Sequence, residues 1–154
     1  MDKVIVTALL VVVGVISAVF VFNAIFPLVT QSGDAMAGME RRIDQRMKSQ
    51  VEIIQATKTP SDTVKVWVKN IGDVRIAPPE SCDLFFGPEG NYSRIPYDTG
   101  SVYWSYAIVN DTAWNPRATL EVTISGYTPL TAGTRYFAKL TLPTGVASDY
   151  YFSW

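Results

Sequence analysis

The 154-residue sequence predicts an α+β fold, in which a long N-terminal hydrophobic and then amphipathic α-helix precedes an antiparallel, Ig-like β-sandwich. Residues 4–29 contain no charged side chain, and their apolar residues would cover every face of a helix. From Thr63 onward the apolar period changes from about 3.6 to 2 residues, and glycine- and proline-rich turns recur between short segments. We therefore expect a helical segment over 1–58 and a β-sandwich domain over 59–154.

The apolar segment 4–29 is long enough to cross a bilayer, since a helix rises about 1.5 Å per residue. Burying each such side chain is worth about 1.5–3 kcal/mol, so exposing the whole segment to water would be very costly. It could be a secretion signal, a permanent membrane anchor or the packing rod of a polymer. A signal peptide fits poorly, because the apolar run is too long and no A-x-A-like cleavage site follows it.

Pro27 predicts a kink or a short break in this helix, because proline lacks an N–H and disfavours helical geometry at the residue before it. Helical periodicity then resumes over 34–57, where charged residues occupy the opposite face and Pro60 ends the helix. The apolar residues recur at spacings of three and four: Met36, Met39, Ile43, Met47, Val51 and Ile54. We expect this stripe to pack on the following domain; packing on copies of itself, as a seam, is the alternative.

The strand pattern starts with "TVKVWVKN" (63–70), in which valines alternate with Lys65, Trp67 and Lys69. "IGDVRI" (71–76) is expected to turn at Gly72 and return as a short strand, which would form a hairpin. Further strands are predicted over 83–86, 92–95, 102–109, 119–124, 135–142 and 150–154. The aromatic C-terminal strand should be docked in the sheet. "VYWSYAIVN" should send one face into the core, and its other aromatic side chains are either partly exposed or a subunit contact.

Composition argues against several functions. The net charge is −1 without a basic stripe, so nucleic acid is not an expected partner. The absence of histidine excludes Ser-His-Asp and Cys-His catalysis, and no spacing indicates a metal site or a phosphate-binding loop. We therefore expect no enzyme activity, catalytic residue, cofactor, metal or small-molecule substrate. Cys82 has no intrachain partner and should be a small buried apolar residue. Asn91 and Asn110 begin N-glycosylation triplets near turns, which could carry glycans if the protein is exported.

"VKVWVKNIGDVRI", with Lys69, Asn70 and Gly72, and the ending "TLPTGVASDYYFSW" resemble the archaellins and their relatives in the archaellum, within the type IV pilin-like superfamily. The resemblance implies a structural subunit of an extracellular motility filament, a homopolymer. Its apolar helix would be inserted in the membrane and handled by the archaellum motor platform before assembly. The helix residues expected to pack in the filament core are Val4, Ala8, Leu10, Gly14, Val15, Ala18, Phe22 and Phe26.

Some features depart from that group. No glutamate lies near the start of the apolar helix, unlike in pilins, and Pro27 with Asn23 is unusual in an archaellin rod. No Lys/Arg-Gly cleavage site precedes the run, so a leader was either removed upstream of Met1 or does not exist. The alternatives are a membrane-anchored archaellum stator or accessory protein, whose sandwich binds the surface layer, and an adhesion pilin. In a filament, an arginine at Gly14 or Val15 should abolish assembly while a 60–154 fragment stays folded.

Overall fold

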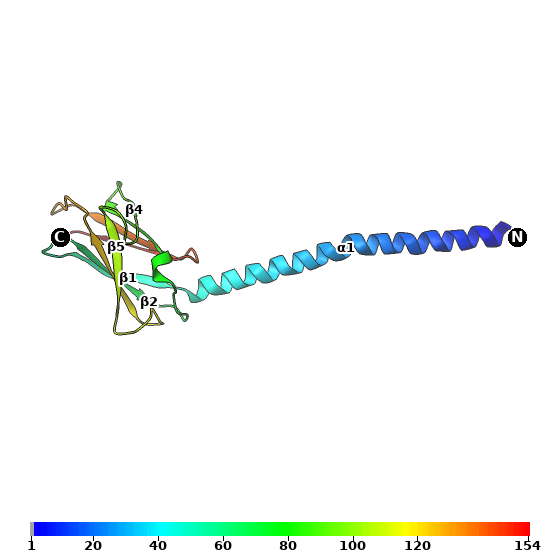
Figure 1. Cartoon of the computed structure of the whole chain (residues 1–154), viewed down its shortest axis with the longest axis horizontal. Coiled ribbons are helices and arrows are strands. Elements are labelled where there is room, and N and C mark those ends of the chain that lie inside the picture. Colours follow the sequence, from blue (N-terminus) through cyan, green and yellow to red (C-terminus); the bar gives the residue numbers. More distant parts are fainter. Residues whose placement is uncertain (1) are drawn as a thin grey trace. The chain divides into compact units, whose positions relative to one another are not determined.

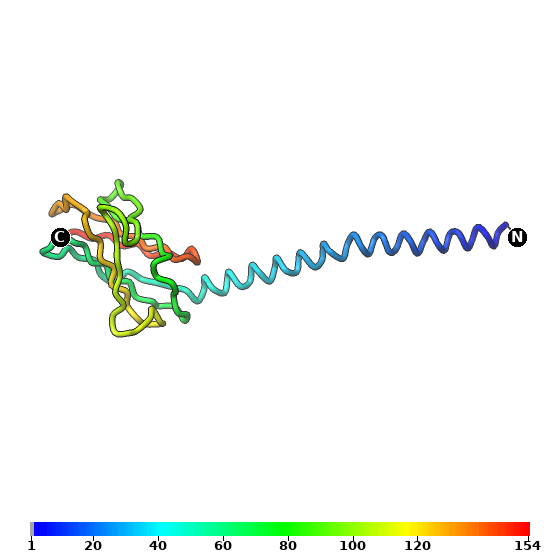
Figure 2. Tube along the Cα trace, in the orientation of Figure 1, coloured from blue at the N-terminus to red at the C-terminus, as the bar shows by residue number. Residues whose placement is uncertain are grey.

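The structure, a computed structural model, describes residues 2–154; residue 1, the first position of the predicted 1–58 segment, lies outside the described residues. One long helix, α1 (Asp2–Lys48), comes first along the chain, and strands and one short 3-10 helix follow it (Figures 1 and 2). These elements are β1 (Val51–Lys58), β2 (Val64–Asn70), η1 (Pro79–Ser81), β3 (Asp83–Pro88), β4 (Ser93–Ile95), β5 (Tyr103–Val109), β6 (Thr119–Ser125), β7 (Tyr136–Thr141) and β8 (Ala147–Phe152). The chain forms two compact units, one up to Arg42 and the other Ile43–Trp154.

The strands form two four-stranded sheets, ordered β1-β2-β6-β5 and β4-β3-β7-β8. Every strand pair within the sheets is antiparallel. The prediction of an α+β protein with a long N-terminal helix and an antiparallel sandwich is therefore confirmed. Its Ig-like character stays a prediction.

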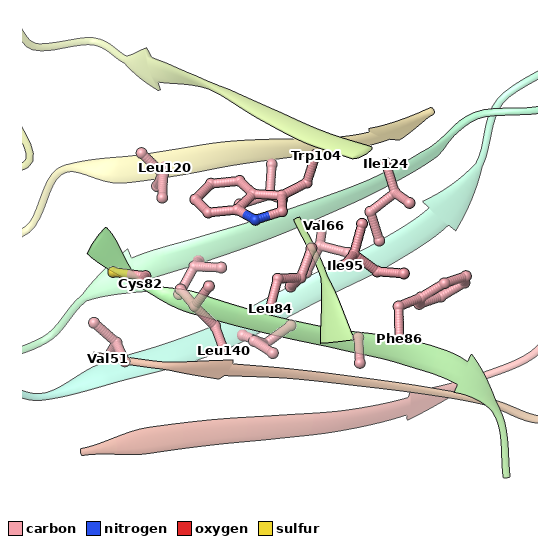
Figure 3. Packing of buried hydrophobic residues seen from close by; sticks show 14 of the residues in the cluster. Val51, Val66, Cys82, Leu84, Phe86, Ile95, Trp104, Leu120, Ile124 and Leu140 are labelled. Carbon is pink, nitrogen blue, oxygen red and sulfur yellow. The ribbon is translucent and has the colours of Figure 1, made fainter. Parts of the chain in front are cut away.

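The core lies between the inner faces of the two sheets (Figure 3). Each inner face comes from alternate residues of its strands, as the period of two predicts. On β2, for example, Val64, Val66 and Val68 are fully buried, while Lys65 and Trp67 between them are half-buried. The largest buried side chains across the core are Trp104, Trp114, Tyr136, Phe86, Leu84 and Leu120.

The helix predicted over 34–57 ends at Lys48, and residues 51–58 form strand β1 instead. The prediction failed because the spacing of Met47, Val51 and Ile54 also fits a helix. The residues of β1 favour a strand, since β-branched side chains pack well on a pleated sheet. Val51 and Ile53 alternate into the core, and β1 pairs with the whole of β2.

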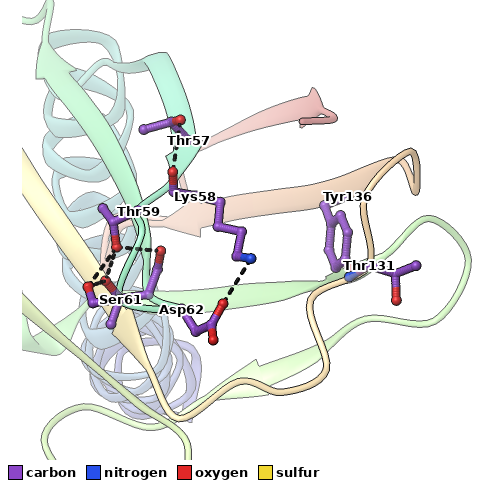
Figure 4. Close-up of polar contacts among 8 residues, drawn as sticks. Thr57, Lys58, Thr59, Ser61, Asp62, Thr131 and Tyr136 are labelled. Carbon is purple, nitrogen blue, oxygen red and sulfur yellow. Dashed lines mark hydrogen bonds and ion pairs between the residues drawn. The ribbon is translucent and has the colours of Figure 1, made fainter.

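The predicted hairpin at 71–76 is also wrong, because no strand follows β2 there and the neighbours of β2 are β1 and β6. The stretch near Pro60, expected to end a helix, instead forms the turn between β1 and β2. In this turn the Thr59 N–H donates to the Thr63 carbonyl at 2.8 Å. Lys58 pairs with Asp62 at 2.8 Å (Figure 4).

Helix α1 passes through Pro27 without an interruption of its helical assignment, so the predicted short break is absent. Proline removes one backbone donor at this point, and a nearby hydroxyl bonds to carbonyls of the same turn. The Thr30 hydroxyl lies 3.0 Å from the Pro27 carbonyl and 3.2 Å from the Phe26 carbonyl.

The remaining predicted strands are confirmed, with ends that shift by a few residues. The largest shift is in the last strand, because β8 begins at Ala147 and not at Tyr150. The prediction that the aromatic C-terminus docks in the sheet is confirmed, since β8 pairs with β7 along its length. Beyond β8, the Trp154 ring stacks on Tyr136 with 4.5 Å between ring centroids.

Candidate functional site: the apolar helix and the α1–β1 junction

The first part of α1 has the length and composition of a membrane-spanning helix. An 18-residue window within α1 has a mean hydropathy of 3.0, and none of that window is buried in the protein. Such a surface needs apolar surroundings on every side, from lipid or from other protein chains. The helix is therefore long and apolar enough to cross a membrane, by length and composition.

Hydroxyl groups at both ends of the apolar segment are hydrogen-bonded within the helix itself. The Thr7 hydroxyl donates to the Lys3 carbonyl at 2.8 Å, and the Ser32 hydroxyl donates to the Leu28 carbonyl at 2.8 Å. A hydroxyl bonded in this way costs much less to place in lipid than an unpaired one. These residues are thus compatible with a helix in or next to a bilayer.

The residues expected to pack in a filament core all lie on α1, and all are exposed in the single chain: Val4, Ala8, Leu10, Gly14, Val15, Ala18, Phe22 and Phe26. A methyl group placed on Gly14 would meet nothing within 4 Å, so a second helix could approach closely there. Lipid or another helix could cover this surface equally well. Their packing role stays a prediction.

The end of α1 is hydrogen-bonded to the loop that follows β2. The last carbonyls of a helix have no partner within the helix and need other donors. Here the Asp73 N–H donates to the Lys48 carbonyl at 2.9 Å. The N–H groups of Ile71 and Gly72 donate to the Gln50 carbonyl at 2.9 and 3.0 Å. Two residues, Ser49 and Gln50, separate α1 from β1, and the loop 71–73 holds this connection through the hydrogen bonds above. We call Ser49, Gln50 and the loop 71–73 together the α1–β1 junction.

Asn70 organises the junction from inside the protein. Its side chain is completely buried, and its amide group donates to the Val74 carbonyl at 2.9 Å and the Trp114 carbonyl at 3.2 Å. Its side-chain oxygen accepts from the Gly72 N–H at 3.0 Å. Gly72 has no room for a side chain, because a methyl group there would collide with the backbone of Lys48 and Gln50. The "KNIG" stretch, singled out by resemblance alone, thus closes the junction.

A second contact joins α1 to the loop between β7 and β8. The Arg46 Nε donates to the Thr144 carbonyl at 2.8 Å. The guanidinium group also approaches Gly145, where an added methyl group would lie 3.0 Å from it. No signal in the sequence indicates this contact, because Arg46 and Thr144 are separated by 98 positions, and the motif that contains Thr144 does not point to Arg46.

The part of the apolar helix stripe that belongs to the same compact unit as the sandwich does not pack on it as expected. Ile43 and Met47 belong to the same compact unit as the sandwich, and they are 53% and 72% exposed. Met36 and Met39 are exposed as well. Val51 is buried, but it belongs to β1 rather than to the helix. The exposed stripe therefore consists of Met36, Met39, Ile43 and Met47, and we call it the methionine stripe.

The aromatic strand β5 sends Trp104 into the core, which confirms that one of its faces is buried. Tyr106 is half-buried, and its hydroxyl donates to the Glu80 carboxylate at 3.0 Å. Burial and this carboxylate raise the pKa of Tyr106. Tyr97 lies beside both side chains, with 4.9 Å between its ring centroid and that of Trp104. A subunit contact at Tyr103 and Tyr106 stays a prediction.

The prediction that Cys82 is a buried apolar residue is confirmed, because only 3% of the residue is exposed. Burial, with smaller effects of Asp83 and Glu80, raises the pKa of its thiol from 9.0 to about 12. The thiolate is the reactive form, so we expect native protein to resist maleimide or disulfide reagents at pH 8. Denatured protein should react at once, and labelling followed by mass spectrometry checks this.

The same shift makes stability depend on pH. Between about pH 9 and 12 the unfolded chain loses a proton that the folded chain keeps, so stability should fall with rising pH there and not below it. The stability of Cys82→Ala, measured by urea unfolding, should not show this fall between about pH 9 and 12. Equal labelling of native and denatured protein would contradict the buried position.

Asn91 and Asn110 are both exposed, and they follow β3 and β5 respectively. The exposure suits a glycan acceptor, but attachment stays a prediction. Among residues 2–154 no group of three or more acidic or cysteine side chains is placed to hold a metal ion. The expectation that the protein is not an enzyme also stays a prediction.

No protein-family model and no curated protein matches the chain. Solved structures do match. A chain of the archaellum periplasmic stator protein complex FlaF and FlaG from Sulfolobus acidocaldarius is 28% identical at a TM-score of 0.60, covering 68% of this chain and 89% of that chain. The archaellum periplasmic stator protein FlaG from the same organism is 28% identical at a TM-score of 0.61, covering 68% of this chain and 99% of that one. This chain is thus similar to stator proteins, an archaellum-associated family, and the resemblance to archaellins themselves is not confirmed.

Proposed function

We propose that this protein is a membrane-anchored subunit of an archaellum stator. In this role α1 stays in the membrane, and the sandwich contacts other archaellum proteins or the surface layer outside it. The observation that carries the proposal is the 28% identity to stator proteins at TM-scores of 0.60 and 0.61. The expected archaellin role, with its homopolymeric filament, receives no support from these neighbours.

The apolar helix fits a permanent anchor on physical grounds. A single helix in lipid needs no other copy of the chain to cover its apolar surface. Lys3 lies at the N-terminal end of the apolar run, and positively charged residues favour the cytoplasmic side. The sandwich would then lie on the outer side of the membrane, where a stator can contact fixed structures of the cell surface.

Fractionation of cells that express the full chain tests the proposal. The protein should stay in membranes washed at alkaline pH, be absent from sheared filaments, and co-purify in detergent with a FlaF- or FlaG-type protein of the same cell. A chain that begins at Ile43 is the matched control and should leave the membrane fraction. Recovery of the full chain as a main component of sheared filaments would overturn the stator role and restore the filament hypothesis.

Val15→Arg adds a second comparison between the two roles. One arginine at the centre of a spanning helix costs roughly 2.5–3.5 kcal/mol on insertion scales, which the surrounding apolar residues offset. The variant should therefore remain in the membrane fraction as a stator protein. In a filament the same arginine would be buried among packed helices and should prevent assembly.

A further inference from the structure

We propose that the methionine stripe is the contact between two copies of this chain, whose α1 helices pair in parallel and in register next to the membrane. This inference rests on the membrane anchor of the proposed function and goes beyond it. It concerns the helix surface that follows the apolar segment, where no lipid tails cover the side chains.

The stripe is unpartnered in the single chain. Met36, Met39, Ile43 and Met47 are 53–72% exposed, although each is a large apolar residue. Their spacings of three and four place them on one face of α1, over about 17 Å of helix length. A contiguous apolar face of this kind is typical of a helix that packs on another helix.

Membrane anchoring selects a second copy as the partner. The stripe begins seven residues after Val29, the last residue of the apolar segment, so a bilayer would hold every copy with its stripe at one height and in one direction. Two neighbouring copies then present the same residues to each other without any search for register. A different protein would need a matching apolar face at the same height.

The charges beside the stripe select the parallel orientation. At about 100° per residue, Glu40 and Asp44 lie along one side of the stripe, and Arg42 and Arg46 lie along the other. In a parallel pair each side faces the opposite side of the partner, so acidic residues face basic ones twice. In an antiparallel pair like charges would face each other.

Two of these charges are free to act between copies. Asp44 already pairs with Lys48 at 2.8 Å, and Arg46 donates to the Thr144 carbonyl. No ion pair within residues 2–154 involves Glu40 or Arg42. Glu40 and Arg42 are therefore the residues through which the pairing can be tested.

Cysteine cross-linking of the full chain in liposomes tests the contact, with no other archaellum protein present. Wild-type protein is the blank, because its only cysteine, Cys82, is buried. Met39→Cys and Ile43→Cys should form disulfide-linked dimers more than about tenfold faster than Arg41→Cys, which lies on the opposite face at the same level, since the two Cβ atoms must come within about 4.5 Å. Equal rates at the three positions, or no dimer at any of them, would overturn the proposal.

Charge reversal in the Ile43→Cys background tests the orientation. Glu40→Lys alone and Arg42→Glu alone should each slow dimer formation, because each places like charges on both sides of the stripe. A mixture of the two variants should give mixed dimers preferentially, since their sides are again complementary. Preferential dimers of each variant with itself would contradict the parallel arrangement.

The outcome is separable from that of the proposed function. A chain that resists alkaline extraction but does not cross-link leaves the anchor intact and removes the pairing alone. A chain that is not held by the membrane at all removes the anchor itself. A FlaF- or FlaG-type partner added to the liposomes should not be needed for the cross-link.

Discussion

A fragment that begins at residue 59 is expected to remain unfolded, whereas one that begins at Ile43 should fold cooperatively. The shorter fragment lacks β1, which contributes Val51 and Ile53 to the core. At about 1.5–3 kcal/mol for each buried apolar side chain, this loss alone is a large part of the 5–15 kcal/mol that stabilises a typical domain. The sequence alone predicts that a 60–154 fragment folds. The structure leads to the opposite expectation, because such a fragment lacks strand β1.

The loss extends beyond these two side chains. Removing β1 leaves the inner strand β2 as an unprotected edge, with its backbone groups open to pairing with other chains. It also removes a link to the other sheet, because the Ile53 N–H donates to the Ser148 hydroxyl at 3.0 Å. Aggregation or an unfolded circular dichroism spectrum is therefore expected for the 59–154 fragment. A cooperative urea transition of equal midpoint in both fragments would contradict this role of β1.

Replacing Asn70 by alanine is expected to destabilise the unit Ile43–Trp154 by about 3 kcal/mol, because buried polar groups that lose their partners cost about 1–3 kcal/mol each. The Val74 carbonyl and the Gly72 N–H would lose the partner that Asn70 supplies, although the Gly72 N–H keeps the Gln50 carbonyl. Urea unfolding of the unit measures the change. Asn91→Ala, at an exposed asparagine, is the matched control and should leave stability unchanged.

The same variant should loosen the α1–β1 junction selectively. Hydrogen exchange of the Ile71, Gly72 and Asp73 amides should become faster in Asn70→Ala than in Asn91→Ala, because these amides bond to the carbonyls of Lys48 and Gln50 at the junction. Amides of β6 should change much less than these. A loss of stability below about 1 kcal/mol, with unchanged exchange at the junction, would contradict the role of Asn70.

The sequence predicted those elements whose pattern has one interpretation. The alternation of Val64, Val66 and Val68 fits a strand and no helix, and the uncharged run 4–29 fits a helix that needs apolar surroundings. It failed at β1, where the spacing of Met47, Val51 and Ile54 fits a continued helix and neither glycine nor proline marks its end. Pairing with β2 decides the structure of 51–58, and such pairing is not visible in a local pattern.

The functional surfaces were predictable to a smaller degree, for a related reason. A filament subunit and an anchored stator protein need the same apolar helix, so the residues from Val4 to Phe26 do not separate the two roles. The charges of Glu40 and Arg42 are visible in the sequence. Whether these charges can act between two copies depends on the exposure of the methionine stripe. That exposure follows from the fold and not from the helical period.

The α1–β1 junction also determines how the molecule would respond to a pull. Only Ser49 and Gln50 separate α1 from β1. Hydrogen bonds from the loop after β2 hold this connection, so it is not a flexible linker. A load on the sandwich would reach the helix at once rather than first straightening a loose linker. Any elastic deformation must then occur in α1 itself. There, Gly33 and Gly38 each weaken the helix by up to about 1 kcal/mol relative to alanine.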